Sequence, residues 1–395
     1  MTNWAEIGQK YYLQSVRRPS IIFVRGEGPW LWDEQGKRYL DFVAGWAVNC
    51  LGHCPPVMVN AITEQAKTLI HGSAGFYNIP QLKLAQLLVD NSALDRIFFA
   101  NSGAEANEGA CKLARKYGKK NRNGAYEVIT ALNSFHGRTL AMTAATGQKR
   151  YHEPFEPVPA GFVNVPFNDI EAIQTATSEK TCAVMLEPVQ GEGGVNIPSD
   201  DYLKQVRAWC DAKGLLLILD EVQTGVGRIG TLFGYESYGV EPDVMTLAKG
   251  MGGGVPIGAF LVKERAAVLT YGEHGSTYGG NALVTAAAYA VAKHVIDNKL
   301  WDNAQNVGEH LLAGLRGLKH KYDFVTDVRG KGLLAAIEFN RDLSDGLVPA
   351  LLEEGLIVNP VKPNALRLMP PLNISNAEAD EAVAMLDKVL AMVGT

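Results

Sequence analysis

The sequence has little of what marks a secreted or membrane-bound protein. Its 395 residues include five cysteines, an odd number, whereas small secreted domains carry an even and dense set. The first ten residues, MTNWAEIGQK, lack the apolar core of a signal peptide. The longest uncharged stretch, residues 275–292, opens with GSTYGGN, so its apolar part is too short to cross a bilayer. We therefore expect a cytoplasmic protein with no membrane partner.

The charges also lack any strong bias. There are 37 Lys and Arg against 42 Asp and Glu, a net charge of −5, and no block of like charge that would predict a nucleic-acid partner. Cys50, His53 and Cys54 lie close together in the chain, but no second pair of ligands accompanies them. We expect these three residues to be structural and the protein to hold no metal.

Glycine, by contrast, is abundant. The chain has 41 glycines in 395 residues, more than the ~7% of an average protein. They follow neither a collagen period nor a low-complexity tract, so each cluster needs its own explanation.

The middle of the chain alternates short apolar runs with helical patterns. The runs, typical of strands buried on both faces of a parallel sheet, are residues 97–100, 128–131, 183–187, 215–220, 244–247 and 257–262. Helical patterns cover residues 105–117 and 201–213. This order predicts an α/β domain of three layers.

The two ends of the chain have a different pattern. Residues 31–43 resemble a hairpin around a Gln-Gly turn. Helical spacing at 303–319 and 376–393 flanks short strands at 332–339 and 366–369. We expect a smaller α+β domain that includes both termini.

Two motifs at predicted strand ends are candidates for ligand binding. Ser102-Gly103-Ala104-Glu105 opens a helix, and its Ser-x-x-Glu pattern forms a capping box or, with free amides, a phosphate site. Asp220 ends the most apolar strand, where α/β sheets bind ligands. A buried carboxylate there needs a cation or hydrogen-bond donors. The next residue, Glu221, would point the opposite way if the strand continues.

Two glycine-rich loops follow. Gly225–Gly230 matches the dinucleotide pattern GxGxxG, but glycines and a proline follow it where that motif requires a helix. Lys249 follows an apolar run and precedes Gly250, Gly252, Gly253 and Gly254. A lysine at this place is either desolvated and reactive or solvated in a flexible loop.

Two arginines and one glutamate are candidates for recognising carboxylates. Arg138 lies in FHGRT, and Arg367 lies within an apolar strand, where it needs an acidic partner or a ligand. Either arginine could bind a carboxylate through two hydrogen bonds; the alternatives are a surface charge and a structural ion pair. Glu192, in EPVQGEGG, is a possible partner of Arg367.

Together these segments resemble the class III aminotransferases of the ornithine and acetylornithine type, which are fold type I enzymes that use pyridoxal phosphate. The resemblance covers nearly the whole chain. Its most specific motifs are NSGAEANEGACKLAR, FHGRT, EPVQGEGG, LDEVQTGVGR, AKGMGGGVPIGA and HGSTYGGN, in this order. It implies a mostly parallel seven-stranded sheet in a large domain at residues 51–295. It also implies a small domain built from residues 296–395 with a contribution from residues 1–50.

The resemblance implies roles for the residues that match the family's motifs. Lys249 resembles the Schiff-base lysine, and Asp220 the carboxylate that pairs with the pyridine nitrogen of the cofactor. The other cofactor-binding positions it implies are Ser102, Gly103 and Ala104 at the phosphate, Phe135 on the ring, Gln223 near the ring hydroxyl, and Thr277 at the phosphate of the neighbouring subunit. Ala104 stands where threonine is common in the family.

The resemblance further implies a homodimer with shared active sites and small-molecule substrates. Arg138 resembles the residue that binds the α-carboxylate of N-acetylornithine. Arg367 resembles the one that binds glutamate and 2-oxoglutarate, Glu192 its removable partner, and Ser276 a substrate-binding residue. The products would be N-acetylglutamate semialdehyde and glutamate. FHGRT favours the acetylornithine type, and Trp46 near the substrate entrance leaves the chain length and the acyl group open.

Three alternatives remain open on the sequence. Another ω-aminotransferase of the family would act on succinylornithine, ornithine, 4-aminobutyrate or a lysine-pathway amine. An NAD-dependent oxidoreductase would use the Gly225–Gly230 loop, and a non-catalytic relative would bind the cofactor only for structure.

Overall fold

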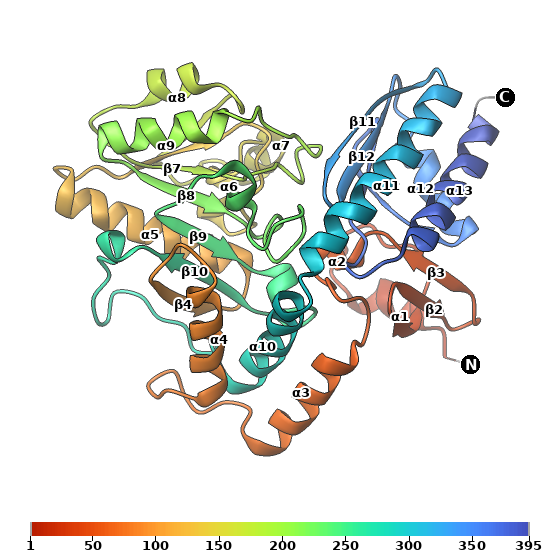
Figure 1. The fold of residues 1–395 in the computed structure, drawn as a ribbon, viewed down its shortest axis with the longest axis horizontal. Helices are drawn as coiled ribbons and strands as arrows, with labels where there is room; N and C mark the ends of the chain where they lie inside the picture. The colour runs from red at the N-terminus through yellow and green to blue at the C-terminus, as the bar shows by residue number, and fades with distance from the viewer. Residues whose placement is uncertain (1, 394–395) are drawn as a thin grey trace.

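A seven-stranded sheet forms the centre of the larger part of the molecule in a computed structural model that describes residues 2–393 (Figure 1). Its strands lie in the order β4 (Arg96–Ala100), β10 (Gly258–Val262), β9 (Val244–Leu247), β8 (Leu216–Asp220), β7 (Thr181–Leu186), β5 (Glu127–Ala131) and β6 (Phe162–Val165). All run in one direction except β10, which is antiparallel to both neighbours. The predicted α/β fold with a mostly parallel seven-stranded sheet is confirmed.

The direction of β10 corrects one expectation, because the run at 257–262 was expected to join the sheet as a parallel strand. Residues 248–257 connect β9 to β10, and a crossover between parallel strands needs a dozen or more residues. The short connection therefore returns the chain in the opposite direction.

Both faces of the sheet are covered by helices, as side-chain alternation along β8 shows. Leu216 and Ile218 belong to the buried cluster that includes the helix α5 (Gly103–Asn121), whereas Leu217 and Leu219 belong to the cluster on the other face, with α9 (Tyr202–Lys213). Figure 1 shows α9 and α8 (Ile170–Ala176) together above the sheet, with α5 on the opposite side. Since successive residues of a strand point to opposite faces, a strand covered twice is apolar throughout.

The remaining helices of this part surround the sheet edges and the loops. α10 (Ala282–Asp297), in the stretch predicted as a loop running into a buried helix, packs against α3 (Pro56–Thr68) and α4 (Ile79–Asp90). The short helical turns are α6 (Leu140–Ala145), α7 (Lys149–His152), η1 (Glu153–Phe155), η2 (Gly234–Tyr238), η3 (Lys249–Met251) and η4 (Glu264–Ala266).

The smaller part lies to the right in Figure 1 and contains two four-stranded sheets. One is antiparallel, in the order β11 (Val325–Lys331), β12 (Leu334–Phe339), β15 (Ala365–Leu368) and β14 (Asn359–Lys362). The helices that accompany it are α11 (Leu300–Lys321), α12 (Ser344–Glu354) and α13 (Asn376–Val393).

The second sheet joins the two ends of the chain. Its order is β1 (Phe23–Glu27), β2 (Trp30–Asp33), β3 (Arg38–Asp41) and β13 (Leu356–Ile357). β2 and β3 form the predicted antiparallel hairpin, while β3 and β13 are parallel: the Leu40 amide donates to the Gly355 carbonyl at 2.7 Å and the Phe42 amide to that of Ile357 at 2.9 Å. α1 (Trp4–Tyr11) precedes this sheet and α2 (Ala44–Ala47) follows β3. Within residues 2–393, no helix is both long and apolar enough to span a membrane.

Candidate active site

A cavity of about 450 Å³ opens at the carboxyl edge of the central sheet. This is where parallel α/β sheets place their ligands, because loops from several strand ends converge there. Predicted site residues that line it are Ser102, Gly103, Ala104, Phe135, Arg138, Glu192, Asp220, Gln223 and Lys249. The sequence separates these residues by as much as 147 positions, and the sheet brings them to one place.

The start of α5 forms one end of the cavity. Ser102 is the N-cap residue, and its hydroxyl accepts a hydrogen bond from the Glu105 amide at 3.2 Å. The Glu105 carboxylate accepts a hydrogen bond from the Asn101 amide at 2.7 Å. In a standard capping box the donor would be the amide of the N-cap residue, Ser102, so the predicted cap forms with this donor shifted to the preceding residue. The amides of Gly103 and Ala104 have no acceptor within the helix because they lie in its first turn. This end therefore combines free N–H donors with the positive end of the helix dipole.

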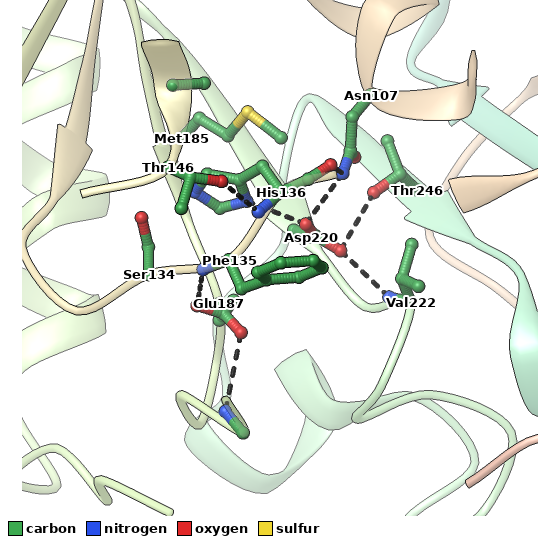
Figure 2. A network of polar contacts seen from close by, with 12 residues as sticks. Asn107, Ser134, Phe135, His136, Thr146, Met185, Glu187, Asp220, Val222 and Thr246 are labelled. Atoms are coloured by element: carbon green, nitrogen blue, oxygen red, sulfur yellow. Dashed lines mark hydrogen bonds and ion pairs between the residues drawn. The ribbon is translucent and has the colours of Figure 1, made fainter. Parts of the chain in front are cut away.

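Asp220, at the end of β8, is the centre of a buried polar network (Figure 2). Its Oδ2 accepts from His136 Nδ1 at 2.7 Å and from Asn107 Nδ2 at 2.8 Å. Its Oδ1 accepts from the Val222 amide at 3.0 Å. Thr246 Oγ1 also donates to Oδ1 at 3.4 Å, so four donors hold this carboxylate in one orientation at the cavity wall.

The charged form of His136 is favoured by this network. Burial alone lowers the pKa of its imidazole, but the hydrogen bond and the charge of Asp220, with a smaller effect of Glu187, outweigh burial and raise the pKa above its ordinary value. His136 is thus a hydrogen-bond partner of Asp220 whose protonated form Asp220 stabilises. Sequence reasoning gave it no role, because only the folded chain joins two residues 84 positions apart.

Lys249 follows β9 and begins the turn η3. Its backbone φ is +42°, in the left-handed region that side chains other than glycine rarely adopt; such conformations concentrate at functional sites. Burial and the charge of Arg367 lower the pKa of its ammonium group below the ordinary value, against the opposing charges of Glu192 and Asp220. A lysine in this state is a more available nucleophile and base than one in water.

Arg367 is fully buried on β15 and borders the cavity through its partners. Its Nη2 donates to Glu192 Oε1 at 2.6 Å and its Nη1 to Gln223 Oε1 at 3.0 Å. The structure thus forms the Arg367–Glu192 pair that the sequence could only suggest. Burial raises the pKa of Glu192, but the charges of Arg367 and Lys249 lower it more, so the carboxylate stays ionised. Gln223 lines the cavity and also contributes to holding Arg367.

Arg138 differs from Arg367 because its guanidinium has no acidic partner within residues 2–393. It is exposed at the cavity rim and lies over the ring of Tyr151, 4.3 Å from the centroid, and near the ring of Phe135 at 5.3 Å. Cation–π contacts orient the side chain without neutralising it. The cavity therefore has one open cation and one masked cation.

Ser276 and Thr277 do not line this cavity. They line a separate depression that also includes Phe98 and His274. The Ser276 hydroxyl accepts from Asn101 Nδ2 at 3.1 Å, whereas Thr277 is exposed.

Glu221 points away from Asp220, as expected from strand alternation. It is buried and accepts hydrogen bonds from the amides of Gly234 and Tyr235. Burial raises the pKa of its carboxyl group to about 7. Residues Gly225–Gly230 continue in turns to η2 and open no α-helix, which argues against the dinucleotide motif.

The structure supports the expected structural role for Cys50 but not for Cys54. Cys50 is buried and its Sγ donates to the Gly250 carbonyl at 3.1 Å, while Cys54 is exposed. Among the described residues, no group of three or more His, Cys, Asp or Glu side chains is arranged to hold a metal ion.

The cavity fits a flat, phosphorylated cofactor. Free amides occupy one end, and the fixed carboxylate of Asp220 and the amine of Lys249 lie within reach of the same space. A Cβ on Gly103 would lie 2.8 Å from Val222 Cγ1, so glycine is needed for α5 to approach this wall. His136 Nε2 and Asn107 Oδ1 are buried polar atoms without a hydrogen-bond partner in the described chain. These features match the donors and charges that pyridoxal phosphate requires.

Comparison with known proteins shows which proteins and structures the chain is similar to. Residues 11–390 match the family model described as aminotransferase class-III. An acetylornithine aminotransferase of Caldanaerobacter subterraneus is 50% identical over 98% of both chains, and one of Methanocaldococcus jannaschii is 48% identical over 99% of this chain and 98% of the relative. A solved ornithine aminotransferase of Toxoplasma gondii, with PLP partly occupying its active site, has a TM-score of 0.94 and 33% identity and covers 99% of this chain and 94% of its own.

Proposed function

Because the chain belongs to the class III aminotransferases, which depend on pyridoxal phosphate, we propose that it transfers the terminal amino group of N-acetylornithine to 2-oxoglutarate. The observation that carries this proposal is the pair of arginines around Lys249. Arg138 is open at the rim, whereas Arg367 is masked by Glu192. The names of the relatives at 47–50% identity support the choice of N-acetylornithine.

Pyridoxal phosphate, when bound, supplies a ring that takes up the amino group and the electron pair released at the substrate carbon. The amides of Gly103 and Ala104 would hold its phosphate, and Lys249 would hold it covalently. The carboxylate of Asp220, held in one orientation by its donors, would keep a proton on the ring nitrogen. Released from the cofactor, the Lys249 amine would move a proton at the substrate carbon.

The two arginines explain how one site accepts two kinds of substrate. N-acetylornithine reacts at a terminal amine, so its α-carboxylate would lie at the rim, on Arg138. 2-Oxoglutarate reacts next to its α-carboxylate, which would bind Arg367 after Glu192 moves away. While Glu192 stays in place, the inner cation is unavailable and the donor enters with its amine first.

We further propose a cytoplasmic homodimer whose partner contributes to each site. Phe76, Tyr77, Ile79 and Tyr278 are large apolar side chains that are 63–86% exposed, and Asn78 Nδ2 joins the two segments by donating to the Gly280 carbonyl at 3.0 Å. A cluster of this kind marks an interface, and it lies next to Thr277. The five free cysteines favour a reducing compartment.

The test is a kinetic panel on the protein loaded with pyridoxal phosphate. N-acetylornithine, succinylornithine, ornithine and 4-aminobutyrate are compared as donors to 2-oxoglutarate by kcat/KM, and light scattering gives the mass in solution. We expect the highest kcat/KM with N-acetylornithine and twice the mass of one chain. Turnover of free ornithine well above that of its acetylated form would contradict the substrate assignment.

A further inference from the structure

The carboxyl group of Glu187 is hydrogen-bonded to two segments that both contribute residues to the cavity lining. Glu187 directly follows β7, is buried, and lines the cavity. Its Oε2 accepts from the Phe135 amide at 3.2 Å, as Figure 2 shows, and its Oε1 from the Gly191 amide at 3.4 Å. One side chain thus connects the loop of Phe135 with the turn that precedes Glu192.

These loops carry the two groups that face substrate carboxylates. Three residues after the Phe135 amide comes Arg138, the open cation, and one residue after the Gly191 amide comes Glu192, which masks Arg367. The turn at Gly191 is closely packed, because a Cβ there would clash with the carboxamide of Gln223. A displacement at either anchor therefore moves a substrate-facing charge.

We propose that Glu187 is a positioning residue that fixes the loop of Phe135 and Arg138 (the Arg138 loop) relative to the turn of Gly191 and Glu192 (the Glu192 turn), and so sets the relative affinities for the two substrates. This inference rests on the proposed function only for the identity of the substrates. Without the Glu187 anchor, the Arg138 loop loosens and the carboxylate of the amine donor binds less well. The Glu192 turn loosens as well, so Glu192 leaves Arg367 more readily and the dicarboxylate acceptor binds better.

The chain offers a matched control in Glu221. It too is a buried glutamate next to the end of a central strand, it too accepts two backbone amides, and burial raises the pKa of both carboxyl groups to about 7. Glu221 does not line the cavity. A Glu→Gln change at either position removes an ionisable carboxyl group from a buried site with two backbone amide donors. Only Glu187 connects the substrate-facing loops.

The experiment compares E187Q and E221Q with the unchanged protein. For E187Q we expect the KM of the amine donor to rise and that of the acceptor 2-oxoglutarate to fall, each by about two- to tenfold, the effect of one hydrogen bond. Glutarate, which cannot react, should bind E187Q more tightly in calorimetry. E221Q should shift neither KM. Equal changes of both KM values, or the same split in E221Q, would overturn the proposal.

Two further measurements keep the test decisive. Amide hydrogen exchange of the protein loaded with pyridoxal phosphate should be faster in E187Q at residues 134–138 and 190–193 and unchanged elsewhere; uniform acceleration would overturn the proposal. If E187Q does not fold, E187D, which is too short to reach both amides, should show the same opposite shifts. Because exchange needs no substrate and the kinetics use whichever donor the protein prefers, failure of the N-acetylornithine assignment remains distinguishable.

Discussion

Replacing Glu192 with glutamine should turn Arg367 from a masked cation into an open carboxylate site. In the structure Glu192 Oε1 lies 2.6 Å from Arg367 Nη2, and the side chains are 22% and 0% exposed. The pKa of Glu192 is below its ordinary range, because the charges of Arg367 and Lys249 outweigh the effect of burial. The pair is therefore charged at neutral pH, and a dicarboxylate must displace Glu192 to reach Arg367.

The size of the effect follows from what glutamine retains. Its amide oxygen still accepts a hydrogen bond from the charged guanidinium, but the negative charge of the acceptor is lost, and charge adds about 0.5–2 kcal/mol to a hydrogen bond worth about 1 kcal/mol. Gln223 and Asn359 remain as partners of Arg367. Displacing the side chain should thus become easier by about 1–2 kcal/mol, which corresponds to about five- to thirtyfold in affinity.

The assay measures two constants for E192Q: the acceptor's KM in steady-state turnover with 2-oxoglutarate, and the dissociation constant of glutarate. Both should fall by that factor, and the ratio of kcat/KM for N-acetylornithine over glutamate as donors should fall with them. E338Q is the control, because Glu338 forms a comparable 2.7 Å pair with Arg329 and does not line the cavity. An unchanged glutarate affinity in E192Q, or an equal gain in E338Q, would refute the reasoning.

Three other changes give separate readouts. K249A should abolish the visible absorbance of the bound cofactor and reduce kcat by about 10²–10⁴, the usual contribution of a proton-transfer group; a retained band and normal turnover would contradict its role. R138L should raise the KM of N-acetylornithine at least about tenfold and leave that of the acceptor within about twofold, as steady-state kinetics will show. Glu221 has its pKa raised by burial from 4.5 to about 7, so the stabilisation from its protonated form is complete below pH 4.5 and is lost as pH rises to 7. The free energy of unfolding in urea, measured at pH 5 and pH 8, should show that E221Q removes about 3 kcal/mol of this pH dependence. An equal change in the free energy of unfolding between the two pH values in both proteins would refute this prediction.

Much of the central sheet could be predicted because its strands are apolar on both faces. The run that ends at Asp220 is five fully buried residues in the structure, and a charge at the end of such a run stands out in the sequence. Lys249 stands out in the same way between a buried strand and a group of glycines. Local pattern was sufficient for these residues because strand burial and strand ends are both visible in the sequence.

Features that depend on contacts between distant segments were not predictable in this way. β6 is short and half-buried at one edge, so Phe162–Val165 lacks the apolar signature of a central strand. His136, Asn107 and Glu187 were not assigned roles because their partners are fixed only by the fold. The domain boundaries near residues 50 and 295 and the roles of Ser276 and Thr277 stay predictions.

The pairing of β3 with β13 has a consequence for biosynthesis. Leu40 pairs with Leu356, so more than 300 residues must leave the ribosome before this edge of the hairpin is covered. At about 5–20 residues per second, the edge remains unpaired for about 15–60 s. An uncovered strand edge is a template for association with other chains. Newly made molecules should therefore be vulnerable to aggregation, and dependent on chaperones, from the time the hairpin emerges until Leu356 and Ile357 have left the ribosome.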